Sequence, residues 1–245
     1  MRFRVPLFAA VLSATALALS LIAIVPDHVS ALEKAAAPFD GENDAWSAGG
    51  ASASISYYNI CTGWIWVWSG WEDGDRLGLQ VDSFGFGCYL LSHFTYFVSA
   101  APSGYGFTGT AGVHTADSND CPVGTLATQP FLPITGWNLL TWNVPTPGSF
   151  VLTYDFASAQ GLPNPAAIAT EHPAAGPTGP AACGTCYPTN RTNHSFYFGT
   201  GASPLCPGSP LNDGLCDAQF LWDVQMACPF PVDETSWGQI KGLYR

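Results

Sequence analysis

The feature that most constrains this sequence is its rhythm of short apolar runs separated by turn residues. From residue 51 onward, runs rich in Trp, Tyr, Phe, Val, Ile and Thr alternate with Gly, Pro, Asn and Asp. Aromatic and β-branched residues favour strands, whereas the intervening residues favour turns. The expected strands are 54–60, 63–68, 77–84, 91–100, 108–115, 137–144, 150–155, 167–171, 195–199 and 220–227. This pattern, with no helical segments between the runs, predicts an all-β fold.

The clearest strand is the segment that begins at Phe150. Phe150, Leu152, Tyr154 and Phe156 alternate with other residues and share one face by the two-residue period of a strand. About ten such strands in one domain, residues 51–232, predict an antiparallel β-sandwich, with a jelly roll as the favoured version and a barrel as the alternative. Residues 158–193, rich in Pro and Gly, are expected to form a long loop excursion.

Both ends of the chain differ from this domain. Arg2 and Arg4 precede an apolar run that ends in the small residues 29–31, so residues 1–31 are predicted to be a signal peptide, with an uncleaved membrane anchor as the alternative. The protein is therefore expected to be secreted or held in the cell envelope, with no stable membrane span after cleavage. Residues 32–50 are predicted to form a flexible acidic lead-in. Residues 233–245 place Trp237, Ile240 and Tyr244 at helical spacing and predict a short C-terminal helix.

The cysteine content supports an oxidising compartment. An even number of cysteines in an exported chain predicts up to four disulfides. We expect Cys61 to pair with Cys88, and Cys206 with Cys216, because each pair closes a modest loop. The Cys183–Cys186 pair is expected to be a structural disulfide, with a zinc site or a redox pair as alternatives. The eight cysteines are Cys61, Cys88, Cys121, Cys183, Cys186, Cys206, Cys216 and Cys228.

The negative net charge of the chain limits the classes of ligand that we expect it to bind. The formal net charge is −11 at pH 7, and charged residues make up only 10% of the chain. Binding of nucleic acid depends on neutralising phosphates with Lys and Arg, so a nucleic-acid partner is not expected. Anionic membrane surfaces are disfavoured for the same reason. Metal cations and neutral ligands such as glycans are compatible with this charge.

A run of tryptophans is the strongest candidate for ligand contact. In a strand, Trp64, Trp66 and Trp68 lie on one face, Ile65 and Val67 lie on the other, and Trp71 follows. Because a sandwich strand normally buries one face, the second apolar face is either covered or offered to a ligand. Exposed indoles suit the apolar faces of sugar rings. The alternative is that these tryptophans belong to the core.

An acidic turn follows the tryptophan run directly. Glu72, Asp73 and Asp75, with Gly74 between them, offer the oxygen ligands and backbone freedom that calcium sites use. The same residues are good turn formers, so an ordinary turn is the alternative. This turn is therefore a candidate site for a structural calcium ion.

Catalytic motifs are not evident. The sequence contains neither a Gly-x-Ser-x-Gly elbow nor a His-Glu-x-x-His pair. A Ser–His–Asp site or a carboxylate pair, with Glu72 and Glu171 as conceivable members, could still assemble in space. No catalytic residue is predicted, and the lack of such motifs in the sequence favours a protein that is not an enzyme.

The chain resembles the secreted jelly-roll modules of bacterial extracellular proteins, an architecture shared by many carbohydrate-binding modules. The resemblance lies in the strand rhythm, in Trp137-Asn-Leu-Leu-Thr-Trp142 before a Pro-containing turn, and in Phe150–Phe156 after it. No site motif of a particular module family is present, so the resemblance concerns architecture. It implies a sandwich fold, and fold alone does not give function.

Three functions follow as hypotheses. The first is a secreted or cell-envelope binding protein that takes a glycan on the aromatic surface of Trp64, Trp66, Trp68 and Trp71. The second is a structural or adhesive surface protein whose partner is another surface protein. The third is a secreted hydrolase. Exposed tryptophans favour the first, and a buried tryptophan run favours the second.

Overall fold

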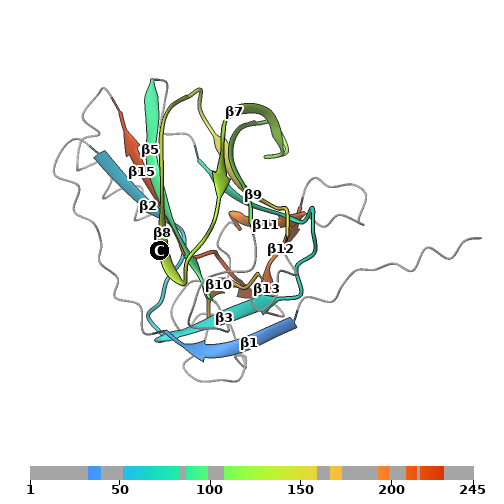
Figure 1. Ribbon diagram of the computed structural model, residues 1–245. Helices are drawn as coiled ribbons and strands as arrows, with labels where there is room; N and C mark the ends of the chain where they lie inside the picture. Colours follow the sequence, from blue (N-terminus) through green and yellow to red (C-terminus); the bar gives the residue numbers. More distant parts are fainter. Residues whose placement is uncertain are drawn as a thin grey trace, which may run out of the picture.

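Two antiparallel sheets pack against each other in the computed structural model, which describes residues 33–39, 52–82, 87–98, 108–158, 166–172, 193–198, 208–213 and 216–228 (Figure 1). The described residues contain strands and no helix. The prediction of an all-β antiparallel sandwich is confirmed. Among these residues no helix is long and apolar enough to cross a membrane.

Sheet A contains seven strands in the order β1-β3-β10-β5-β15-β2, with β8 paired to the other edge of β5. The strands pair antiparallel throughout the described part of the sheet, and strands distant in sequence lie side by side. The strands are β1 (Glu33–Pro38), β2 (Ser52–Ser56), β3 (Trp64–Ser69), β5 (Cys88–Phe97), β8 (Gly136–Thr146), β10 (Ile168–Glu171) and β15 (Trp222–Ala227).

Sheet B contains six strands in the order β12-β11-β4-β9-β6-β7, and a short pair, β13 with β14, lies beside the two main sheets. In Figure 1, β2, β5, β8 and β15 form one side of the molecule, and β7, β9, β11 and β12 form the other. These strands are β4 (Arg76–Val81), β6 (Gly109–Ala116), β7 (Pro122–Phe131), β9 (Phe150–Phe156), β11 (Ser195–Phe198), β12 (Ser209–Pro210), β13 (Asn212–Asp213) and β14 (Cys216–Asp217).

The main core lies between the inner faces of the two sheets. The four alternating residues predicted for β9 are all buried there, from 0% exposed at Phe150 to 3% at Phe156. Opposite them, the Trp222 ring of β15 packs edge-on against Tyr154, with ring centroids 4.8 Å apart. Aromatic burial on this scale is the main stabilising contribution to such a domain.

One disulfide fastens sheet A. Cys88 at the start of β5 is bonded to Cys228 just after β15, and the two residues are 140 positions apart in sequence. The predicted pairing of Cys61 with Cys88 is therefore wrong, because the cross-strand neighbour of Cys88 comes from the far end of the chain. Cys61 and Cys121 also belong to disulfides. The predicted Cys206–Cys216 and Cys183–Cys186 pairs lie outside the described side chains.

Five strands were not expected from the sequence: the longer strands β1 and β7, and the two-residue strands β12, β13 and β14. Residues 33–38 form β1, which pairs along its whole length with β3, where a flexible lead-in was predicted. Strand β7 is interrupted by two bulges, at which Leu126 and Val123 have no residue opposite them on β6. Bulges and prolines are typical of edge strands, and β7 pairs with β6 alone among the described strands of sheet B.

The loop excursion predicted for 158–193 is interrupted by β10 within sheet A. The C-terminal helix predicted for 233–245 lies outside the described residues.

Candidate binding face on sheet A

Sheet A carries apolar side chains on both of its faces. Alternation along β3 sends Trp66 and Trp68 into the main core, whereas Ile65 belongs to a second cluster with Tyr96 and Leu221. This second cluster lies on the face of sheet A that points away from sheet B. The expectation that β3 has two apolar faces is thus met, but the tryptophans occupy the inner one.

We define the aromatic face as the side chains that gather on this outer surface around Tyr96. The registers of β5, β8 and β15 place Trp137 opposite Tyr96, and place Leu139 and Asp223 on either side of Phe94. The segments after β1 and β2 add one further ring each. The residues of the aromatic face are Phe39, Tyr58, Phe94, Tyr96, Trp137, Leu139 and Asp223.

Ring contacts hold this surface together. The Tyr96 ring has two edge-on neighbours, Phe39 and Trp137, each with centroids 5.3 Å away. The Tyr58 ring lies 6.3 Å from that of Trp137 at an angle of 37°. Tyr96 is buried, the rings of Phe39, Tyr58 and Trp137 are partly exposed, and Leu139 is 57% exposed. The face therefore combines a fixed apolar base with accessible rings.

One carboxylate sits among these rings. The Tyr58 hydroxyl donates a hydrogen bond of 2.9 Å to Oδ2 of Asp223. Burial raises the pKa of the Asp223 carboxyl above its ordinary value, although hydrogen bonds from Ser56 and Tyr58 act in the opposite direction. Burial and the nearby Asp223 charge also raise the pKa of the Tyr58 hydroxyl. This is a polar pair in an apolar setting, able to orient a ligand hydroxyl or amine.

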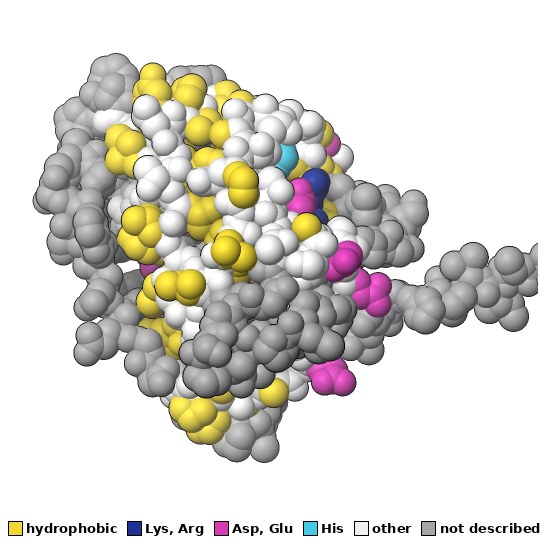
Figure 2. Space-filling view, viewed as in Figure 1, with side chains coloured by type: hydrophobic (Ala, Val, Ile, Leu, Met, Phe, Trp, Pro, Cys, Tyr) yellow, Lys and Arg dark blue, Asp and Glu magenta, His cyan; other side chains and the backbone are white. Residues whose placement is uncertain are grey.

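The neighbouring segment that contains β7, of sheet B, and β8, of sheet A, has no charged residue. From Cys121 through Tyr154 the sequence contains no Asp, Glu, Lys, Arg or His. Its exposed apolar side chains are Val123, Leu126, Leu132, Ile134 and Leu139. Figure 2 shows hydrophobic side chains spread over the face of the molecule that carries β7 and β8, with acidic side chains lying to one side. The aromatic face thus borders a surface that would not repel an uncharged ligand.

The tryptophan run predicted to bind ligand is largely internal. Trp66, Trp68 and Trp71 are 5%, 6% and 1% exposed, and only Trp64 is partly exposed. The Trp68 indole N–H donates to Thr170 Oγ1 at 2.8 Å, and that of Trp71 donates to the carbonyl of Trp68 at 2.9 Å. An exposed platform of four indoles is therefore not what β3 presents, because sheet B and the strand partners cover the Trp face.

Strand β1 helps to cover the tryptophan side chains of β3 with the ammonium group of Lys34. The Lys34 ammonium lies over the Trp66 ring at 4.5 Å and over the Trp68 ring at 5.4 Å. We predict that Lys34→Met lowers the free energy of unfolding by about 0.5–1 kcal/mol, because the methylene packing is kept and the cation–π attraction is lost. Chemical denaturation would measure this. Lys34→Arg, which keeps a cation at the same position, is the control and is expected to retain stability, and intrinsic tryptophan fluorescence unchanged by Lys34→Met would contradict the contact.

The conformation of the acidic turn at residues 72–75 is stabilised by the side-chain carboxylate of Asp75. Oδ2 of Asp75 accepts from the backbone N–H of Glu72 at 2.8 Å, and the Tyr197 hydroxyl lies 3.4 Å from Oδ1. Asp75 is buried, and these bonds are those of a turn capped from within. Within the described part of the chain no three His, Cys, Asp or Glu side chains gather. Calcium at Glu72, Asp73 and Asp75 stays a prediction.

Glu171, considered above for a carboxylate pair, and the nearby Ser195 both have structural partners. Both carboxylate oxygens of Glu171 accept backbone N–H groups, one from Asn59 at 2.6 Å and one from Gln219 at 2.9 Å. The Ser195 hydroxyl contacts Gln219 Oε1 and accepts the backbone N–H of Phe220, each at 2.9 Å. These hydrogen bonds connect β10, β11 and residues 219–220, which precede β15, in the interior of the domain.

The comparisons with known proteins identify no family. No protein-family model matches the sequence, and no curated protein matches it. A solved structure of the cysteine protease and lectin-like domains of Cwp84, a surface layer associated protein of Clostridium difficile, is similar with a TM-score of 0.44 and 10% identity over 73% of this chain. The match covers 36% of that chain, so this protein spans about a third of its length. A similarity this low transfers no function.

Sequence reasoning missed the aromatic face because its residues come from five separate segments. The sequence pattern assigns Trp137 and Leu139 to a strand and to the architectural resemblance but not to a site, and Tyr58 and Asp223 belong to no motif. One available signal was the segment 137–142, in which both alternating sets contain large apolar residues. As in the tryptophan run, this indicates a strand with a second apolar face.

Proposed function

We propose that this protein is a non-catalytic β-sandwich domain that acts outside the cytoplasm and binds a glycan on the aromatic face. The observation that carries the proposal is the exposure of the Trp137 and Tyr58 rings beside the Asp223 carboxylate, on a sheet surface that takes no part in packing against sheet B. Partly exposed rings can cover the apolar faces of sugars, and carboxylate and hydroxyl groups can bond to sugar hydroxyls. The disulfides support an oxidising location.

The test compares the two aromatic surfaces of sheet A directly. Mature protein would be screened on a glycan array, in calcium and in chelator, and selected oligosaccharides would be measured by calorimetry. Trp137→Ala is expected to weaken binding at least tenfold, by about 1.4 kcal/mol or more, because it removes a stacking surface. Trp64→Ala, which truncates the partly exposed tryptophan on the opposite face of β3, is expected to bind as the wild type does.

Two controls keep this test decisive. Leu139→Ser alters an exposed side chain of the same face and is expected to weaken binding severalfold while the melting temperature stays within a few degrees. If Trp64→Ala abolishes binding and Trp137→Ala does not, the site lies at the tryptophan run and the proposal fails. It also fails if no glycan binds in either calcium or chelator.

The uncharged segment that contains β7 and β8 favours a second candidate, a structural or adhesive surface protein. The loop between these two strands exposes Leu132 and Ile134 at 70% and 62%, and exposed apolar side chains of this kind commonly mark contacts between proteins. Self-association measured by sedimentation, lost in Leu132→Lys, would support this candidate.

A further inference from the structure

Asp223 has no cationic partner among the residues that the structure describes. Only two Lys or Arg side chains belong to those residues, and both are engaged elsewhere. Lys34 lies over Trp66 and Trp68 on the other face of sheet A, and Arg76 pairs with Asp155 across β4 and β9, with Nη2 and Oδ2 2.9 Å apart. The Asp223 carboxylate is instead held by the neutral hydroxyls of Ser56 and Tyr58.

A carboxylate in this position is costly to the fold. Its neighbours across the strands are Phe94 on β5 and Ser56 on β2, and the Tyr58 ring leads from it toward Trp137. Partial burial of a charge without a counter-ion is unfavourable, so a residue of this kind is often retained for binding. A cation that reaches the carboxylate would also meet the faces of aromatic rings, which attract cations.

Resting on the proposed glycan function, we infer that the natural ligand is an amino sugar polymer with free, protonated amino groups. Such a ligand offers sugar faces to Trp137 and Tyr58 and an ammonium group to Asp223. A charge-assisted hydrogen bond between ammonium and carboxylate is stronger than one from a neutral amide or hydroxyl. The net charge of −11 on the whole chain adds a long-range attraction for a polycation.

The experiment measures affinity for three matched oligosaccharides: glucosamine oligomers, N-acetylglucosamine oligomers and glucose oligomers of equal length. Wild-type protein is expected to bind the glucosamine oligomer about tenfold more tightly than the other two at pH 6, where its amines are charged. Asp223→Asn is expected to bring this ratio close to one. Glu33→Gln, which removes an exposed carboxylate at the start of β1, is expected to leave the ratio unchanged.

The outcomes separate this inference from the function on which it rests. If the three oligomers bind equally and Trp137→Ala weakens all of them, the glycan function stands and the inference is overturned. If none binds, both fail. Equal loss of preference in Glu33→Gln, or polylysine binding as tight as the glucosamine oligomer, would show that general charge attraction is responsible and would also overturn the inference. Melting temperatures of both variants confirm that they fold.

Discussion

The double variant Cys88→Ser/Cys228→Ser is expected to lose about 3–5 kcal/mol of unfolding free energy. The disulfide joins residues 140 positions apart, and by the chain-entropy model a cross-link that closes so long a loop restricts the unfolded chain strongly. The cross-links that involve Cys61 and Cys121 shorten the effective loop and reduce the loss. Equilibrium denaturation of both proteins under non-reducing conditions measures the difference.

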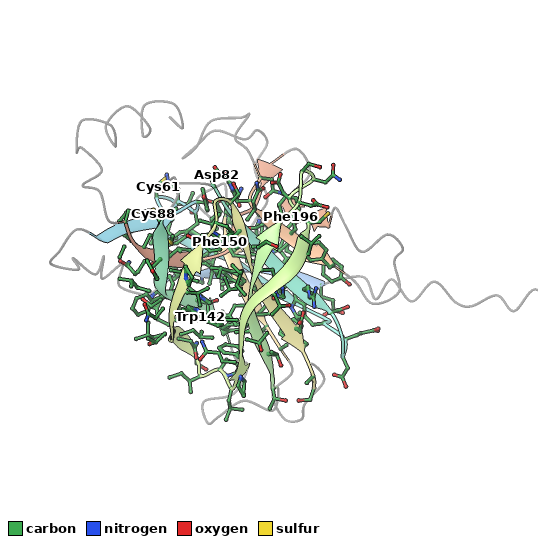
Figure 3. The ribbon with its side chains drawn as sticks, turned by 90° about the horizontal axis from the view of Figure 1, so that it is seen from above. Cys61, Asp82, Cys88, Trp142, Phe150 and Phe196 are labelled. Carbon is green, nitrogen blue, oxygen red and sulfur yellow. A yellow bond between two sulfur atoms is a disulfide. The ribbon has the colours of Figure 1, made fainter. Side chains whose placement is uncertain are left out.

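The position of this disulfide gives the variant a local signature as well. Cys88 and Cys228 lie next to the pairing of Tyr89 with Ala227, at one end of the β5–β15 contact. Figure 3 shows Cys88 well separated from Trp142 of β8. Hydrogen exchange is therefore expected to accelerate most at the adjoining ends of β5 and β15. A variant that loses less than 1 kcal/mol and shows uniform exchange would mean that strand pairing alone fixes this end of sheet A. Leu139→Ser is a matched control elsewhere on the sheet.

The strands that the sequence predicts correctly are those in which the pattern of apolar side chains agrees with the burial of the strand in the sandwich. Strand β9 alternates large apolar residues and lies between β4 and β6, so its pattern and its place in the sandwich agree. Strands β1 and β7 are edges, and edge strands bury little. The small Ala35–Ala37 run of β1, and the prolines and bulges of β7, carry little strand propensity of their own. These strands are fixed by their partners.

The aromatic face could not be predicted for a topological reason. Its strands are neighbours in the order β2-β15-β5-β8, and none of these contacts is between strands adjacent in sequence. Local patterns in the sequence indicate where strands begin and end but not the order of the strands in the sheet. The tryptophan run showed that sheet A has two apolar faces, but not which face turns inward. Burial of the larger indoles removes more apolar area from water than burial of Ile65 and Val67 does, which explains the observed orientation.

The same topology also determines the polar interior. In sheet A, His93 faces the main core and is completely buried. Its Nδ1 accepts the indole N–H of Trp142 at 2.8 Å, so the ring proton is on Nε2, which donates to the Tyr154 hydroxyl at 2.6 Å. This chain links β8, β5 and β9 across both sheets. In Figure 3, Trp142 of sheet A and Phe196 of sheet B lie apart on the two sides of the sandwich that it connects.

Acidification is expected to destabilise the protein through this histidine. Burial lowers the pKa of His93 to about 3, well below its ordinary value of 6.5. Between these two values the unfolded chain binds a proton that the folded chain does not. Stability is therefore fully present above pH 6.5 and falls as the pH drops toward 3, by about 1.4 kcal/mol per pH unit at the steepest. Burial and the Arg76 charge lower the pKa of His114 and add in the same direction.

Urea denaturation of the wild type and of His93→Gln between pH 7 and pH 5 isolates this contribution, because few carboxylates titrate in that window. The variant is expected to be less stable at pH 7, where its hydrogen bonds to Trp142 and Tyr154 are imperfect, but to lose stability with a slope smaller by close to one proton. The slope is informative even where the variant is weakened. Equal slopes in the two proteins, or an NMR titration of the His93 ring with a midpoint near 6.5, would show that the imidazole is protonated in the folded state and that the buried chain from Trp142 to Tyr154 does not keep it neutral.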